Sequence, residues 1–294
     1  MLRIVAKLFG VLVLFVVLAG IGLAVHLYYA GRTHSENPQY VALGSSFAAG
    51  PGITERAPGS PITCGRSKDN YPHLLARKQQ LSLVDVTCSG AITKYILEDG
   101  PMLQPAQINA VSEETELVTV TIGGNDVSYM GNLMALGCDA STGSVERFLG
   151  VCRVKSVEKV DKDFAALPSR LTKIANEVHA RAPKARLIFV NYFTVLPESG
   201  TCKRLELSVE AADRMRMVAQ RLASTIHDVA LNNHAEVLDL SSLSASHNVC
   251  AKDPWLQGRH TGSFFIAPLH PNLEGMEATA EALNQLLDKP SAAQ

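Results

Sequence analysis

The alternation of short apolar runs with longer amphipathic stretches is the feature that most constrains the fold of this 294-residue chain. Five runs rich in Val, Ile and Leu have the length of buried strands, and they span residues 40–43, 83–87, 117–122, 186–191 and 236–240. Helical patterns lie between and after them, at residues 71–80, 157–182 with an interruption at Pro168, 207–233 and 273–287. Strands that alternate with helices predict an α/β fold, with a parallel sheet covered on both faces in a doubly wound topology.

The N-terminal segment has the features of a membrane-spanning helix. Arg3 and Lys7 precede an apolar run from residue 8 to residue 25, which is long enough to cross the hydrocarbon core of a bilayer. The residues that follow, 26–30, do not form the small-residue site at which signal peptides are cleaved. We therefore expect residues 1–32 to be an uncleaved signal anchor with its basic end in the cytoplasm. The alternative is a long signal peptide on a secreted protein.

The remainder of the chain predicts one globular domain. A polar linker at residues 33–38 leads into a domain at 39–288, and a loose tail follows at 289–294. With 47% hydrophobic and 19% charged residues, the chain is not persistently disordered. Its formal net charge of -1 provides no overall positive field, so we expect no nucleic-acid partner. We expect a monomer that meets the membrane through its N-terminal helix.

The cysteines suit an exported domain. Their number is even, and they show no C-x-x-C motif and no spacing suited to zinc; they are Cys64, Cys88, Cys138, Cys152, Cys202 and Cys250. Six cysteines allow many connectivities, and counting alone does not distinguish them. We favour sequential pairing along the chain, because each bridge would then close an irregular segment between regular elements.

Three loops follow predicted strands and therefore face the same edge of the sheet. They are residues 44–50 (GSSFAAG), 88–91 (CSGA) and 123–126 (GGND). In doubly wound folds, ligand sites form outside the carboxyl ends of the strands. Each motif alone is typical of an ordinary turn, but their coincidence at one edge favours a functional site.

The residues in these loops match the needs of acyl transfer, which are a nucleophile, a base and donors aimed at the developing oxyanion. Ser46 suits the nucleophile. The backbone N–H groups of Ser46 and Gly90 and the side-chain amide of Asn125 suit the donors. Among nine histidines, His270 is the candidate base because it directly precedes the last helix. Activity is therefore predicted to fall as the pH drops through the pKa of this histidine, which is about 6.5 if unshifted.

These motifs resemble the sequence blocks of the SGNH (GDSL-type) esterases and lipases. The blocks are matched in order and spacing along nearly the whole domain, by residues 42–50, 88–91, 123–126 and 270–275, while residues 64–67 and 70–72 are similar to the secreted bacterial branch. The resemblance implies a flavodoxin-like three-layer sandwich with a five-stranded parallel sheet and three sequential disulfides. It also implies a serine esterase or lipase without cofactor or metal, located outside the cytoplasm of a bacterium.

By the same resemblance, Ser46 is the nucleophile, His270 the base, and Ser46, Gly90 and Asn125 form the oxyanion hole. The chain departs from the family pattern in two places. Ser45 stands where the first block normally has Asp, which leaves the hydrogen bonding of that turn open.

The second departure concerns the carboxylate expected three residues before the histidine, where the chain has Ala267. A methyl side chain cannot orient an imidazole. We therefore predict a Ser-His dyad in which the backbone carbonyl of Ala267 accepts the Nδ1 proton of His270. A more distant carboxylate, such as Asp253, is the alternative.

The segment between residues 241 and 268 is long and lacks clear periodicity, as lids and walls of binding sites often do. We expect Trp255, Phe264 and Phe265 to line an acyl pocket. Alternatively, Trp255 anchors the loop to the core.

Other functions remain open at this point. The same fold could serve as an inactive, membrane-tethered module that binds acylated glycans or lipids, or as an acyl transferase. The ester itself could be an acetylated polysaccharide, a lipid or a small molecule. Three other classes are disfavoured. An α/β-hydrolase elbow would follow several strands, and the motifs of metal hydrolases and nucleotide-binding proteins are missing from the sequence.

Overall fold

The computed structural model describes residues 2–30, 37–101, 103–138, 150, 152–263 and 266–290. Its centre is a five-stranded sheet in the order β2-β1-β3-β4-β5, and every neighbouring pair is parallel. The strands are β1 (Tyr40–Gly44), β2 (Leu83–Asp85), β3 (Leu117–Thr121), β4 (Arg186–Val190) and β5 (Glu236–Leu238). This order is the flavodoxin-like one, which confirms the predicted fold.

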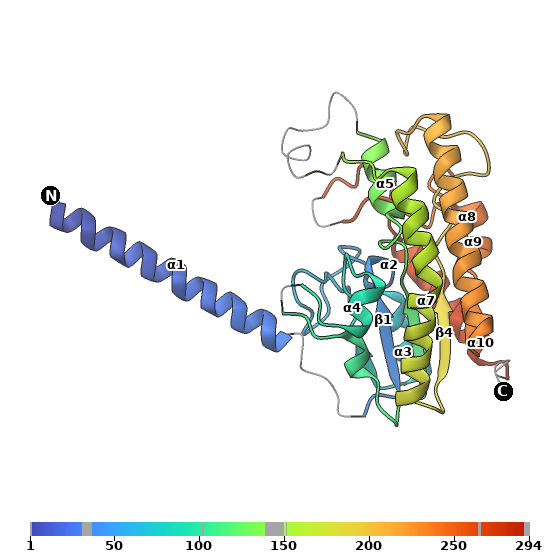
Figure 1. Cartoon of the computed structure of the whole chain (residues 1–294), viewed down its shortest axis with the longest axis horizontal. Helices are drawn as coiled ribbons and strands as arrows, with labels where there is room; N and C mark the ends of the chain where they lie inside the picture. Colours follow the sequence, from blue (N-terminus) through green and yellow to red (C-terminus); the bar gives the residue numbers. More distant parts are fainter. Residues whose placement is uncertain are drawn as a thin grey trace.

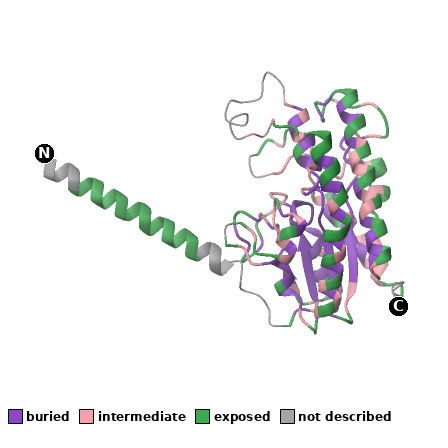
Figure 2. Cartoon of the chain, in the orientation of Figure 1, coloured by how far each residue is buried: buried purple, intermediate pink, exposed green. Residues whose placement is uncertain are grey.

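All five residues of β1 and of β3 are buried, although successive side chains point to opposite faces of the sheet. Both faces are therefore covered, and helices provide the cover. Figure 2 shows buried strands behind helices whose outer sides are exposed. Two helix pairs provide most of the cover, α3 (Tyr71–Gln79) with α10 (Leu273–Leu287) and α7 (Val157–Arg181) with α8 (Val209–Asn232) (Figure 1).

The structure differs from the predicted elements in two respects. Helix α7 continues through Pro168, where we predicted an interruption. The proline removes one hydrogen bond, but the helix buries a continuous apolar stripe that includes Phe164 and Leu171, and this packing holds both halves in line. Short helices were also missed, since they are too short to show a period: α2 (Ser46–Ala49), α4 (Thr93–Leu97), α5 (Tyr129–Leu136), α9 (Leu240–Leu243), η1 (Gln107–Ala110) and η2 (Ala245–His247).

Helix α1 (Leu2–Ala30) contains a stretch, Lys7–Val25, that is long and apolar enough to cross a membrane, with a mean hydropathy of 2.9. The side chains of residues 7–25 are exposed along the whole stretch. A signal sequence has the same properties, so the helix is consistent with either form of export. Residues 33–36 of the predicted linker and residues 291–294 of the predicted tail lie outside the described residues.

Three disulfides form, and they pair the cysteines in sequence order as predicted: Cys64–Cys88, Cys138–Cys152 and Cys202–Cys250. The first joins the loop before α3 to the loop after β2. The third joins the loop after β4 to the long segment before α10. Two of the three bridges therefore fix loops at the carboxyl edge of the sheet.

Candidate active site

Ser46 lies where β1 ends, between the ends of β2 and β3. The strand reaches Gly44, whose φ of +150° is rare for L side chains. A Cβ at Gly44 would lie 2.6 Å from the carbonyl oxygen of Thr121, so only glycine allows the ends of β1 and β3 to approach this closely. The N–H of Ser45 then donates to the same Thr121 oxygen at 2.9 Å, and α2 begins at Ser46. The hydroxyl is thus fixed at the point where the strand order reverses, which is the ligand-binding position of this topology.

The structure brings Ser46 and His270 together across 224 residues of sequence. The Oγ of Ser46 lies 2.8 Å from Nε2 of His270. On the other side of the ring, Nδ1 lies 2.7 Å from the carbonyl oxygen of Pro268. A neutral imidazole with its proton on Nδ1 satisfies both contacts, since Nδ1–H donates to the carbonyl and Nε2 accepts from the serine hydroxyl.

The prediction that Ala267 supplies this carbonyl is therefore wrong by one residue. The reason is the backbone of Leu269, which has a φ of +58° and turns the chain immediately before His270. This turn presents the carbonyl of Pro268, two residues before the histidine, to Nδ1. A carboxylate side chain three residues before the histidine is long enough to reach the ring. A backbone carbonyl has no such reach, so only one that the chain already places beside Nδ1 can accept its proton.

The ring of His270 is half-buried and packs against Phe47, with 4.8 Å between ring centroids. Burial disfavours the charged imidazolium and lowers the pKa of His270 to about 4, against the smaller opposing effect of the Pro268 hydrogen bond. The imidazole is therefore neutral, and able to accept a proton, throughout the neutral range. The value of about 6.5 holds for an unshifted histidine, so the predicted acid loss of activity moves to lower pH.

The structure gives the remaining residues of the long segment other contacts. The backbone oxygen of Asp253 lies 2.8 Å from Nδ1 of His247, and no contact joins Asp253 to His270 among the described residues. Trp255 stacks on His247, with 3.9 Å between ring centroids. Its role in an acyl pocket stays a prediction, and Phe264 and Phe265 lie outside the described residues.

The three candidate oxyanion donors lie on the loops that follow β1, β2 and β3. Ser46 is the first residue of α2, so its N–H has no acceptor within the helix. Gly90 has a φ of +79°, and its N–H, like that of Ser46, finds no acceptor in the part of the chain that the structure describes. The Nδ2 of Asn125 donates one hydrogen to the oxygen of Ala91 at 2.9 Å, which leaves the second free to bind an oxyanion.

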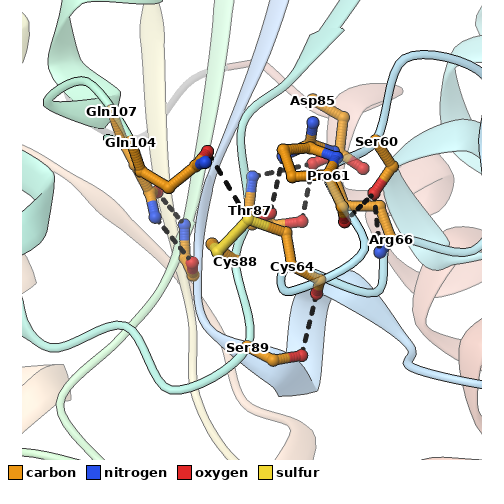
Figure 3. The surroundings of a disulfide bond; sticks show 11 residues. Ser60, Pro61, Cys64, Arg66, Asp85, Thr87, Cys88, Ser89, Gln104 and Gln107 are labelled. Carbon is orange, nitrogen blue, oxygen red and sulfur yellow. Dashed lines mark hydrogen bonds between the residues drawn. A yellow bond between two sulfur atoms is a disulfide. The ribbon is translucent and has the colours of Figure 1, made fainter. Parts of the chain in front are cut away.

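The loop that carries Gly90 is held by the Cys64–Cys88 disulfide and by hydrogen bonds around it (Figure 3). The N–H and Oγ of Ser89 both donate to the Cys64 oxygen, at 3.1 and 2.8 Å. The N–H of Cys88 donates to the oxygen of Gly44 at 3.0 Å. The loop is therefore tied both to the preceding cysteine loop and to the end of β1.

A buried tyrosine, which the sequence analysis missed, connects the first and third loops. The hydroxyl of Tyr192 accepts from the N–H of Gly124 at 2.9 Å and lies 3.5 Å from the Oγ of Ser45. Its ring packs on Phe47 at 4.9 Å between centroids, and a Cβ at Gly124 would lie 2.7 Å from it. Tyr192 follows β4, so the rule that strand ends share one edge could have identified it.

These contacts also distinguish the two adjacent serines. Ser45 is turned toward the buried Tyr192, whose pKa burial raises to about 12, so that the phenol stays neutral. Ser46 is turned toward His270. Ser45 stands where the family pattern has Asp, and the group that its hydroxyl faces in this turn is the hydroxyl of Tyr192.

Asp126 completes the third loop. Its side chain is buried, accepts from the N–H of Thr93 at 2.9 Å and lies 3.4 Å from an Nη of Arg170. Burial raises the pKa of Asp126, and the hydrogen bonds from Thr93 partly oppose that effect. Asp126 therefore joins the loop to α4 rather than to the histidine. No group of three or more His, Cys, Asp or Glu side chains suited to a metal occurs in the described ranges.

Comparison with known proteins identifies relatives along most of the chain. The profile of the GDSL-like lipase/acylhydrolase family matches residues 42–278. Lipase 2 of Streptomyces coelicolor is 32% identical over 250 residues, which cover 82% of this chain and 83% of that protein.

Two solved structures share both fold and sequence. Phospholipase A1 from Streptomyces albidoflavus NA297 aligns with a TM-score of 0.70 and 26% identity, over 85% of this chain and 99% of that one. An extracellular lipase from Streptomyces rimosus aligns with a TM-score of 0.67 and 25% identity, over 84% and 98%. With the matching motifs gathered at one sheet edge and the family profile spanning most of the domain, this chain belongs to the GDSL-like lipase/acylhydrolase family and is a lipase or esterase.

Proposed function

We propose that the protein hydrolyses carboxylic esters through a Ser46-His270 dyad and an acyl-enzyme intermediate. The observation that carries the proposal is the 2.8 Å contact between Oγ of Ser46 and Nε2 of a histidine whose Nδ1 is held by the Pro268 carbonyl. As Oγ attacks the ester carbonyl carbon, its proton passes to Nε2. The carbonyl π electrons move to oxygen, and the resulting tetrahedral oxyanion accepts hydrogen bonds from Ser46, Gly90 and Asn125.

Collapse of this intermediate breaks the bond to the alcohol, which takes the proton from Nε2 and leaves. Water then gives its proton to the same nitrogen and attacks the acyl-enzyme, and a second collapse returns the proton to Oγ as the acid departs. In both halves, Nδ1–H donates to the Pro268 carbonyl. A carbonyl dipole thus holds the tautomer and stabilises the transient imidazolium, in the place of a carboxylate.

The relatives favour lipid esters over the other substrates that the sequence left open. The similar proteins carry the names lipase and phospholipase A1. We propose, by analogy, that the substrate is an ester of a fatty acid.

We further propose that α1 is a signal anchor that holds the domain outside the cytoplasmic membrane. The length and composition of Lys7–Val25 support this. The intact mass of the mature protein tests the proposal, because an anchor retains the N-terminal residues and a cleaved signal peptide loses them.

The dyad is tested by labelling with a fluorophosphonate, which reacts only with an activated serine. The full chain in detergent should be labelled at Ser46, and both labelling and ester hydrolysis should disappear in Ser46→Ala. Ser45→Ala is the matched control and should retain both. An unlabelled wild-type protein that still binds acylated glycans or lipids would favour the inactive binding module.

A further inference from the structure

A cavity of about 330 Å³ opens directly beside Gly90, the candidate oxyanion donor that follows β2. It lies between the loop that carries Cys64, the loop that carries Cys88, and α4 with the segment after it. Gly90 is exposed and forms part of the wall, and a Cβ added there would meet no atom within 4 Å. Gly90 therefore stands at the mouth of the cavity. The cavity therefore borders the loop that supplies a candidate oxyanion donor.

Three polar side chains on the wall, those of Gln107, Ser89 and Arg66, bond to backbone atoms of the protein. The amide of Gln107 both accepts from the N–H and donates to the oxygen of Gly44, at 2.7 and 3.0 Å. Ser89 donates to the oxygen of Cys64, and Arg66, which is 6% exposed, donates to the oxygen of Thr87 at 3.0 Å. Figure 3 shows these bonds arranged around the disulfide.

The wall also carries Thr63 and Gln104, and the remaining surface is largely apolar. It consists of the Cys88 end of the disulfide, Val86, Ala91, the ring of Tyr95 and two prolines. A surface of this composition binds hydrocarbon in preference to a sugar or a charged group, because it offers few unpartnered donors or acceptors. A water molecule takes up about 30 Å³ of liquid, so the cavity holds on the order of ten groups of that size.

Two apolar side chains beside the wall are unusually exposed. Ile62 precedes the wall residue Thr63 and is 62% exposed, and Leu103 precedes the wall residue Gln104 and is 50% exposed. Both therefore lie next to wall residues in the chain. A hydrocarbon chain that leaves a lipid aggregate would meet apolar surface before it reaches the cavity.

We propose that this cavity holds the acyl chain of the ester attacked by Ser46, and that it selects esters of medium-chain fatty acids. The inference rests on the proposed function and adds its substrate class. It also moves the acyl site from the segment around Trp255 to the opposite side of the oxyanion loop. A second cavity, of about 660 Å³, is lined in part by Tyr192 and Tyr129, and none of the candidate oxyanion donors lies on its wall.

The test is the acyl-length profile of the full chain in detergent, measured as kcat/KM for p-nitrophenyl acetate, butyrate, octanoate and dodecanoate. Thr63→Trp places a large ring at the mouth of the cavity from an exposed position. We expect it to lower kcat/KM for octanoate about tenfold, which corresponds to the loss of roughly two buried methylene groups, and to leave acetate within about twofold. Tyr95→Ala widens the cavity and should move the optimum toward dodecanoate.

Thr201→Trp is the matched control, because Thr201 is also an exposed threonine and lies outside the wall of the cavity. Its profile should match that of the wild-type protein. The acetate rate reports in each variant that the protein is folded and that Ser46 is active, so a misfolded variant is recognised by its loss.

Three results would overturn the inference. The first is an acyl profile that stays unchanged in both cavity variants while acetate is still hydrolysed. The second is a change only in the profile over acetates of longer alcohols, which would assign the cavity to the leaving group. The third is a profile that shifts instead when Ala223→Trp fills the second cavity, which is lined in part by Tyr192. Failure of the proposed function is a different result, since the wild-type protein would then hydrolyse no ester and would not be labelled at Ser46.

Discussion

Ser46 and His270 approach each other from regions of the molecule that are built differently. Ser46 directly follows a strand, and each neighbouring loop is bonded to the end of another strand: Ser45 to Thr121, and Cys88 to Gly44. His270 ends a segment whose described residues contain no strand or long helix after β5. Its backbone oxygen accepts from the N–H of Gln257 at 2.8 Å, within a single isolated bridge between Leu256 and Pro271.

The sheet therefore determines the position of the serine, whereas the position of the histidine depends on a loop. The sheet fixes the serine and the oxyanion donors by strand register, which involves many buried contacts. The histidine instead depends on the docking of one segment, in which Asn272 caps α10 through the N–H of Gly275 at 2.9 Å and donates to the oxygen of Pro254 at 2.8 Å. We expect changes on the serine side to alter chemistry with little loss of order, and changes on the histidine side to alter both.

The largest effect should come from Ser46→Ala, which removes the nucleophile and leaves the sheet intact. We expect kcat to fall about 10⁶-fold, as in other serine hydrolases, with little change in the melting temperature. Ser45→Ala, which removes only a hydroxyl facing Tyr192, should change kcat by less than about tenfold. If Ser45→Ala were the inactive variant, the nucleophile would be Ser45 and not Ser46.

Asn125→Ala should give the next largest effect. It removes one oxyanion donor from a loop that is otherwise held by Gly124 and Asp126, so kcat should fall about 10² to 10³-fold while KM stays nearly constant. Steady-state kinetics on a soluble ester, together with thermal unfolding, checks both parts. A loss seen in KM alone would mean that Asn125 binds the ground state and not the oxyanion.

The contrast between the serine side and the histidine side also explains which parts of the site the sequence could predict. Apolar runs located all five strands, and the shared carboxyl edge then grouped Ser46, Gly90 and Asn125 without any knowledge of side-chain contacts. The carbonyl of Pro268 could not be predicted this way, because it depends on a positive φ at Leu269, a residue that rarely adopts one. Burial of the His270 ring likewise depends on how the long segment docks against Phe47.

Two disulfides offer a direct comparison of the regions. The Cys64–Cys88 bridge supports the Gly90 loop, and the Cys202–Cys250 bridge supports the segment that leads to His270. Replacing either pair with serines should lower the free energy of unfolding by about 2–5 kcal/mol. We expect the loss of Cys202–Cys250 to lower kcat about tenfold, because the histidine has few other constraints.

Loss of Cys64–Cys88 should lower kcat less, because Cys88→Ser keeps the backbone hydrogen bond to Gly44. Both variants are measured well below their melting temperatures, so that unfolding does not contribute. The reverse order of the two effects would show that the sheet edge does not hold the Gly90 loop by itself.

The pH dependence of kcat/KM reports the protonation of His270. With the pKa of His270 lowered to about 4 by burial, kcat/KM should keep about nine-tenths of its plateau at about pH 5 and fall only below that. A histidine with the ordinary pKa of about 6.5 would retain about 3% there. A pH profile of kcat/KM on a neutral ester measures the apparent value.

The same shift has a consequence for stability. Between about pH 6.5 and pH 4, the unfolded chain binds a proton at His270 that the folded chain does not, so the free energy of unfolding decreases as the pH falls through this window. His270→Asn removes this contribution and should flatten that part of the stability profile. An equal slope in the variant would assign the dependence to other groups.

The smallest effect should come from Tyr192→Phe, which tests whether the first and third loops are coupled through the buried tyrosine. The change keeps the ring against Phe47 but leaves the N–H of Gly124 buried without its acceptor, which costs about 1–3 kcal/mol of folding stability. Because Gly124 precedes Asn125, we expect kcat to fall about threefold with KM unchanged. Adding Asn125→Ala should then show whether the tyrosine acts through the amide. If it does, the second loss is smaller than in the single variant, because the donor was already displaced, whereas losses that multiply would show that Tyr192 supports Ser45 and α2 instead.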